Sequence, residues 1–174
     1  MRTFPLLILL SVISYQLSAQ SIQQLDAKYG FKGIKLDELI SNLKIPMNFV
    51  STHDDVYSRY LVVDDSYYNV GEAKLYGVII ETISDKVYRI YLKVKGTENL
   101  KSLVESFVQF YGPPTENEEK ETTITYIWQT SLTTLAFHID LNDGIDTEGL
   151  VLLYSKKMFE LDKELKSQKA GSDL

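Results

Sequence analysis

Within the run from Val87 to Val94, apolar and more polar residues alternate from Tyr88 onward. Successive side chains of an extended chain point to opposite sides, so the pattern predicts a strand with one face in the core. The two sets are Tyr88, Ile90, Leu92 and Val94 on one side, and Arg89, Tyr91 and Lys93 on the other. The second set is expected to meet water or a partner.

Further strand patterns lie on both sides of this one. Runs rich in Val, Ile and Tyr, which favour sheets, occupy residues 57–63 and 75–83. Ser84-Asp85-Lys86 is the predicted turn into the alternating strand. Three more strands are predicted toward the C-terminus, with a hairpin loop at 142–149 before the last: 123–129, 132–141 and 150–154.

Three segments show apolar residues at helical spacing. The clearest is 98–111, with Thr97 as the expected N-cap and Gly112-Pro113-Pro114 at its end. A shorter helix is predicted over 36–43, where the apolar residues are Leu36, Leu39, Ile40 and Leu43. A third is predicted over 157–168. Residues 115–122 are acidic with no apolar residue, and are predicted to form a solvated loop.

These elements predict an α+β fold, in which an antiparallel meander sheet carries short helices packed on one face. The order helix, strands, helix, strands favours two weakly similar halves. No linker divides the chain, and its 174 residues suit one domain beside a short leader. We expect a single domain over residues 20–174, with its core at about 31–168 and a frayed C-terminal tail.

Residues 1–19 have the pattern of an export signal. Arg2 supplies a positive start, an apolar run follows from Phe4 to Ile13, and Ala19 is a small residue at the expected cleavage site. A membrane anchor is the alternative, but it needs about 20 predominantly apolar residues, and polar residues return at Ser14. We expect an exported mature protein, periplasmic or extracellular, with no stable membrane insertion.

The composition limits chemistry and partners. The chain has no Cys, which excludes disulfides, thiolate metal sites and a lipid anchor at the cleavage site. It also has no Asn-x-Ser/Thr sequon, which favours a bacterial source. Removing residues 1–19 takes away only Arg2, so 18 basic residues become 17 against 24 acidic ones, and the net charge moves from −6 to −7. Nucleic acid and anionic membranes are therefore unfavourable partners.

Three segments are similar to parts of a known family. They are Phe31-Lys32-Gly33-Ile34-Lys35-Leu36, Leu100 to Pro113 with its Tyr111-Gly112 end, and Trp128-Gln129. Residues 31–154 thus resemble small secreted envelope domains of the β-lactamase-inhibitory-protein-like type, which also include outer-membrane assembly lipoproteins. The resemblance implies binding of a protein partner across an exposed sheet face. It carries over no functional residue, and this chain has no Cys for the acylation of the lipoprotein members.

No G-x-S-x-G elbow, phosphate-binding glycine loop or H-E-x-x-H motif is present. His53-Asp54-Asp55 offers an imidazole and two carboxylates, and Asp64-Asp65 follows the 57–63 strand. A small envelope hydrolase or carbohydrate-active enzyme that uses His53 with these Asp residues is an alternative hypothesis. Solvated loops are the simpler interpretation, and His138 is predicted to face solvent. We expect no metal and no cofactor.

Tyr and Arg are the residue types that dominate binding hot spots. The predicted partner-binding residues are Tyr57, Tyr60, Tyr67, Tyr68, Arg89 and Tyr91. The simpler alternative for each Tyr is that it fills the edge of a sheet. The leading hypothesis is an exported, non-enzymatic protein-binding domain, such as an inhibitor or an immunity protein against a secreted toxin or enzyme. A structural envelope module is a further alternative.

Overall fold

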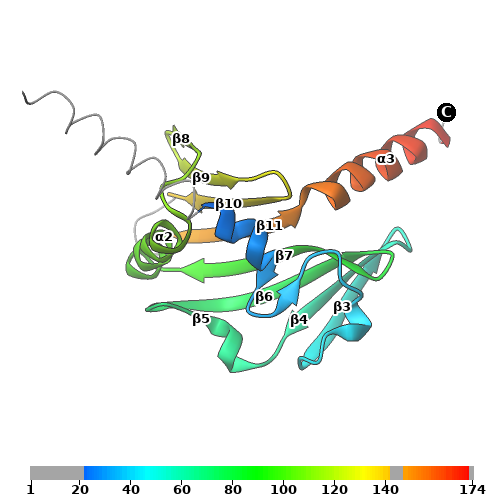
Figure 1. Cartoon of the computed structure of the whole chain (residues 1–174), viewed down its shortest axis with the longest axis horizontal. Coiled ribbons are helices and arrows are strands. Elements are labelled where there is room, and N and C mark those ends of the chain that lie inside the picture. Colours follow the sequence, from blue (N-terminus) through cyan, green and yellow to red (C-terminus); the bar gives the residue numbers. More distant parts are fainter. Residues whose placement is uncertain (1–21, 142–146, 173–174) are drawn as a thin grey trace, which may run out of the picture.

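A large antiparallel sheet organises the computed structural model, which describes residues 22–141 and 147–172 (Figure 1). Its path is β3-β4-β6-β7-β11-β10-β9-β8, and β5 pairs with β6 off this path. The strands are β3 (Met47–His53), β4 (Tyr57–Val62), β5 (Asn69–Val70), β6 (Ala73–Ile83), β7 (Lys86–Lys95), β8 (Glu116–Lys120), β9 (Thr123–Gln129), β10 (Thr133–Asp140) and β11 (Glu148–Ser155). The predicted α+β fold with an antiparallel meander sheet is confirmed.

Helices and short turns complete the described chain. They are a helix over 22–28, the hairpin of β1 (Gly30–Phe31) and β2 (Ile34–Lys35), the 3₁₀ turns η1 (Ile40–Asn42) and η2 (Asp65–Tyr68), and the helices α2 (Thr97–Tyr111) and α3 (Lys156–Ser172). Within the described residues, no helix combines the length and the apolar character needed to cross a membrane. The predicted signal over 1–19 and residues 142–146 of the predicted hairpin loop lie outside the described residues.

Two four-stranded meanders make up the sheet path. β3, β4, β6 and β7 form the first, β8 to β11 form the second, and α2 connects them. Their last strands, β7 and β11, pair in the middle of the sheet, with Leu92 opposite Val151. The sheet is therefore continuous from one meander to the other. α2 packs on one face of this sheet, and α3 approaches the other face.

The main core lies between α2 and one face of the sheet. The buried residues of α2 include Leu100, Leu103, Phe107 and Tyr111. The ring of Phe107 meets those of Trp128 and Phe137 edge to face, at centroid distances of 5.8 and 6.2 Å. Trp128 is fully buried and donates from Nε1 to the Gly112 carbonyl at 2.8 Å. The prediction of this helix is confirmed, although Gly96 rather than Thr97 is the N-cap.

Gly149 lies on β11 where α2 comes close to the sheet. A Cβ at this position would lie 2.3 Å from Cδ2 of Leu100 and 2.7 Å from Cε2 of Phe137. Carbon atoms do not approach this closely without displacing each other, so the close approach of α2 depends on a residue without a side chain.

The predicted helix over 36–43 is wrong, since only the short turn η1 forms there. Asp37 has a φ of 63°, in the left-handed region that interrupts a right-handed helix. Its N–H donates to the Val87 carbonyl, and the Val87 N–H donates to the Glu38 carbonyl, both at 2.8 Å. This backbone therefore pairs with the start of β7 rather than with itself. Leu36 is buried, but Leu39 is 43% exposed.

Both edge strands of the sheet differ from the prediction. The predicted loop over 115–122 contains β8, and no strand was predicted at β3. The side chains of β8 are all exposed, and those of β3 are exposed after Met47. An edge strand is held by backbone pairing on one side, so these two segments form strands without the alternating burial that a sequence pattern would reveal.

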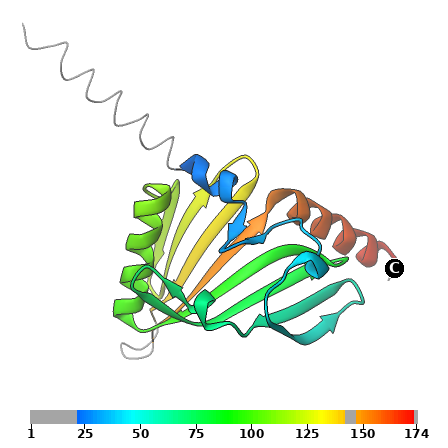
Figure 2. The ribbon, with the colours of Figure 1, turned by 60° about the horizontal axis from the view of Figure 1, so that its bottom comes forward.

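A β-bulge moves Tyr88 away from its predicted position. Arg89 lies opposite Glu81 and Val87 lies opposite Thr82, which leaves Tyr88 as the extra residue. The prediction placed Tyr88 on the face of Ile90, whereas Tyr88 packs with Ile83 and with Met158 of α3 in a second, smaller cluster. The predicted helix over 157–168 is confirmed as part of the longer α3. α3 begins where β11 ends and extends on the side of the molecule opposite to α2 (Figure 2).

Candidate functional site

The sheet face that turns away from α2, here called the open face, carries an apolar row. The strand register places these residues side by side on β4, β6, β7, β11, β10 and β9: Leu61, Ile79, Tyr91, Leu152, Ala136 and Ile127. All six are half-buried, and within the described chain none belongs to the core under α2 or to the cluster at α3. With about 4.8 Å between strands, the row spans about 24 Å.

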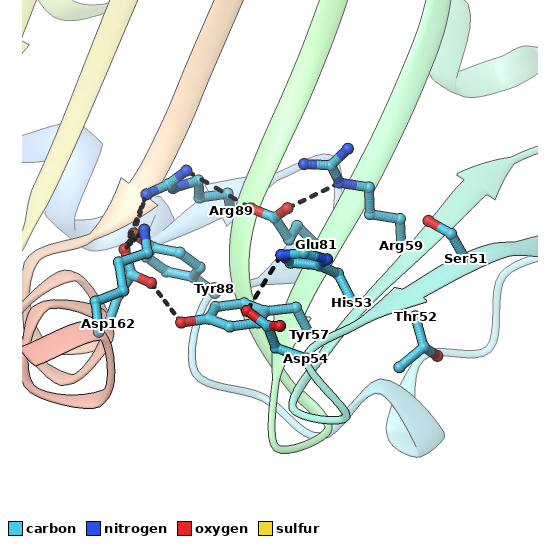
Figure 3. Close-up of a pocket in the computed structure, with 11 residues that line it drawn as sticks. Ser51, Thr52, His53, Asp54, Tyr57, Arg59, Glu81, Tyr88, Arg89 and Asp162 are labelled. Atoms are coloured by element: carbon cyan, nitrogen blue, oxygen red, sulfur yellow. Dashed lines mark hydrogen bonds and ion pairs between the residues drawn. The ribbon is translucent and has the colours of Figure 1, made fainter. Parts of the chain in front are cut away.

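A cavity of about 540 Å³ lies at one end of the open face, where α3 approaches the strands of the first meander (Figure 3). Two buried carboxylates line it, Glu81 from β6 and Asp162 from α3, which are 5% and 2% exposed. Arg59 from β4 and Arg89 from β7 line it as well. Buried carboxylates need charged or hydrogen-bonding partners, and both are supplied with several.

Glu81 is bound by groups from the two neighbouring strands. The Nε of Arg59 donates to its Oε1 at 2.8 Å, and the hydroxyl of Tyr91 donates to its Oε2 at 2.8 Å. Nη1 of Arg89 lies 3.6 Å from the same Oε2. The register explains this convergence, because Arg59, Glu81 and Arg89 are directly opposite one another on β4, β6 and β7.

Asp162 connects α3 to the sheet. Its Oδ1 accepts from the hydroxyl of Tyr57 at 2.7 Å, and its Oδ2 accepts from the hydroxyl of Tyr88 at 3.0 Å and from Lys166 at 2.9 Å. Burial alone would raise the pKa of Asp162, but the hydrogen bonds from Lys166, Tyr57 and Tyr88 outweigh it, so this pKa lies below its usual range. Burial and the bond to Asp162 raise the pKa of Tyr57 to about 12. The carboxylate is thus held ionised and the phenol protonated.

Arg89 links the two carboxylates. Its Nη2 lies 3.4 Å from Oδ2 of Asp162 and also donates to the hydroxyl of Tyr88. Its guanidinium carbon lies 4.2 Å from the centroid of the Tyr88 ring, in the geometry of a cation–π contact. The bulge at Tyr88 makes this possible, because it brings Tyr88 to the side of Arg89. The result is one continuous polar network from β4 to α3.

The rim of the cavity holds His53 and Asp54. Nε2 of His53 lies 3.1 Å from Asp54, and Lys169 of α3 donates to Asp54 at 2.6 Å. The bond from Lys169 keeps the pKa of Asp54 below its usual range. The side chain of His53 is 81% exposed, so this pair is open to solvent.

The carboxylates that the hydrolase hypothesis requires do not meet in this cavity. Asp54 shares the cavity with His53, whereas Asp55 lines a separate hollow beside Lys169. Asp64 caps η2 by accepting from the Ser66 N–H at 2.9 Å, and Asp65 is the first residue of that turn. Across residues 22–141 and 147–172, no three His, Asp or Glu side chains are grouped to hold a metal ion.

The six predicted partner-binding residues separate onto the two faces of the sheet. Tyr57, Arg89 and Tyr91 lie on the open face and belong to the network of the cavity. The other three pack against the main core on the opposite face: Tyr60, Tyr67 and Tyr68. His138 is exposed on the open face, as predicted, and its Nδ1 lies 2.9 Å from the hydroxyl of Thr125.

Sequence reasoning missed Arg59, Glu81 and Asp162. Glu81 is a single charge within the run Val78-Ile79-Ile80-Glu81-Thr82-Ile83, and such a charge signals a buried ion pair. Asp162 follows directly on Leu161 in the apolar stripe of α3, a position where a carboxylate needs a partner. Both signals are present in the sequence, although neither names the partner.

Comparison with family profiles, curated proteins and solved structures gives no match. The functional assignment therefore depends on the geometry of the open face and its cavity.

Proposed function

We propose that this chain is an exported, non-enzymatic protein-binding domain whose open face recognises a protein partner. The observation that carries the proposal is the apolar row across six neighbouring strands. Half-buried Leu and Ile side chains gain from complete removal from water, at about 25 cal/mol per Å² of apolar surface. A partner that covers the row supplies that gain.

The part of the row next to the cavity has the features of a binding hot spot. Tyr91 contributes its ring to the row, and its hydroxyl is fixed by Glu81. Arg89 is held between Tyr88 and the two carboxylates. Side chains that are already ordered lose little conformational entropy on binding, so this part of the open face is prepared for a partner.

The partner expected from the charge is a basic protein. The chain carries a net charge of −6, which favours encounter with a positive surface through long-range attraction. An inhibitor or an immunity protein against a secreted toxin or enzyme is the most concrete form of the proposal. The export pattern of residues 1–19 supports this form, together with the absence of a catalytic motif in the sequence.

The test places one charge within the row. Ala136→Arg adds a long cationic side chain on the open face, while Val108→Arg adds the same charge to the exposed side of α2, where Val108 is 39% exposed. Tagged wild type and both variants are used to capture proteins from the envelope and the medium of the source organism. Recovery of a specific partner should be equal for wild type and V108R, and at least tenfold lower for A136R.

Circular dichroism and amide spectra confirm that both variants are folded before capture. Equal recovery by A136R and V108R would contradict the assignment to the open face. A folded wild-type protein that captures no specific partner would contradict the binding function itself.

A further inference from the structure

The lining of the cavity holds as many cations as carboxylates: Arg59, Arg89 and Lys166 with Asp54, Glu81 and Asp162. Asp54 has a further partner outside the lining, because Lys169 donates to it at 2.6 Å. The three lining cations are shared between the other two carboxylates, Glu81 and Asp162. Three cations around two carboxylates favour a site for an anionic group.

Arg59 is the lining cation that best offers groups to a ligand. Lys166 donates to Asp162, and Arg89 lies between Asp162 and Glu81. Arg59 uses Nε to donate to Glu81 at 2.8 Å, and its side chain is 55% exposed. Its two terminal nitrogens extend away from Glu81 (Figure 3). The end of this guanidinium is therefore partly exposed next to Glu81, and its orientation is fixed by the bond at Nε.

A carboxylate suits this guanidinium better than a phosphate does. The two terminal nitrogens present parallel N–H groups that match the two oxygens of a carboxylate. Ser51 lies opposite Arg59 on β3, lines the same cavity and offers a hydroxyl donor. A phosphate carries close to two charges, and the carboxylates of Glu81 and Asp162 in the same cavity would repel the second.

We infer that the cavity is a carboxylate-binding subsite, in which Arg59 and Ser51 receive the side chain of an Asp or Glu from the bound partner. The inference rests on the proposed function, because the partner that covers the apolar row brings this side chain. Tyr91 connects the two places, since its ring lies in the row and its hydroxyl binds Glu81 beside Arg59. A basic partner with one acidic anchor would fit both the overall charge and the cavity.

The test is an NMR titration of the full mature chain with sodium acetate at constant ionic strength. Saturable shifts are expected for the Arg59 side-chain Nε–H and the Ser51 amide, with a dissociation constant on the order of tens of millimolar, as for one partly exposed charge-assisted pair. Arg59→Gln should weaken acetate binding at least fivefold. Lys93→Gln is the matched control, because it removes one positive charge from the open face outside the cavity and should bind as wild type does.

Two further variants cover the case in which R59Q disturbs the fold by releasing Glu81. Arg59→Lys keeps the charge but lacks the paired N–H groups, and Ser51→Ala keeps the Arg59–Glu81 bond. Both should stay folded and bind acetate more weakly than wild type. Equal binding by R59Q, R59K and wild type, or no saturable shift at all, would overturn the subsite.

The peptide acetyl-Ala-Glu-Ala-amide and its Gln counterpart identify the source of the carboxylate. The Glu peptide should bind at least as tightly as acetate, and the Gln peptide should not bind. Succinate that binds more than tenfold tighter than the Glu peptide would overturn a partner side chain as the source. The titrations need no partner, so a failure to bind acetate would not change the result of comparing A136R with V108R. Equal capture by those two variants would likewise not change the result of the titrations.

Discussion

Asp162 makes the buried polar contacts that attach α3 to the sheet, and we expect Asp162→Ala to reduce stability by about 2–3 kcal/mol. Four groups surround its carboxylate: Tyr57, Tyr88, Arg89 and Lys166. The side chain of Lys166 is 65% exposed, so it regains water when the carboxylate is removed. Tyr88 is 1% exposed and its hydroxyl would lose its acceptor.

The magnitude follows from these differences in exposure. A buried donor without an acceptor costs about 1–3 kcal/mol, and the loss of one charged partner by Arg89 adds about 1 kcal/mol. Ala is the better helix former and returns about 0.5 kcal/mol. The sum is smaller than the 3–5 kcal/mol typical of a broken buried ion pair, because Arg89 keeps Glu81 as a partner.

Urea unfolding followed by the fluorescence of Trp128 measures the global free energy, and hydrogen exchange of the α3 amides measures the docking of the helix. D162A should lower the unfolding free energy by the stated amount and speed exchange in α3 about 30-fold or more. Glu164→Ala, an exposed substitution in the same helix, is the control. In a Tyr88→Phe background the cost of D162A should fall by about 1 kcal/mol. A D162A protein within 0.5 kcal/mol of E164A in both measurements, against an expectation of about 2–3 kcal/mol, would refute the reasoning.

The pH dependence of stability should show the same carboxylate. The folded pKa of Asp162 lies below its ordinary value of 3.8, so its contribution is complete above the unfolded pKa of about 3.9 and is lost as the pH falls through the folded value. The stability difference between wild type and Asp162→Asn should therefore shrink in acid urea titrations, and a difference that is constant with pH would contradict this. Gly149→Ala should destabilise by about 1–3 kcal/mol through overpacking against α2, as measured by the urea midpoint, whereas Gly171→Ala, with open space around it, should cause no loss.

Much of the fold could be predicted wherever a strand or helix has one buried side. Residues 123–129 were predicted as a strand and form β9 with the same bounds, since their alternation ends in the buried Trp128. The prediction of a helix over 36–43 was wrong because helical spacing does not reveal the left-handed conformation of Asp37. The N–H of Asp37 donates to the carbonyl of Val87, far along the chain. β3 was not predicted because the exposed side chains of an edge strand follow no pattern of burial.

The site was less predictable than the fold. Tyr57 and Tyr60 are three positions apart, so a strand places them on opposite faces, and only Tyr57 reaches the open face. The position of Tyr88 beside Arg89 depends on a bulge that alternation alone cannot show. The meeting of Glu81 with Asp162 requires β6, β7 and α3 to be assembled, which is long-range information absent from any local pattern.

The pairing of β7 with β11 also determines the order in which the molecule can be completed. Within each meander, neighbouring strands are close in sequence and can pair early, but Leu92 and Val151 are separated by roughly 60 residues, and closing so long a loop is slow. α3 follows β11 directly, and the carboxylate of Asp162 finds its sheet partners only on β4 and β7. Docking of the helix and the pairing of β11 with β7 therefore support each other, because both bring the C-terminal segment to the first meander. The cavity is lined by both the first meander and α3, so a partner that needs it should bind only a chain in which this long-range docking is complete.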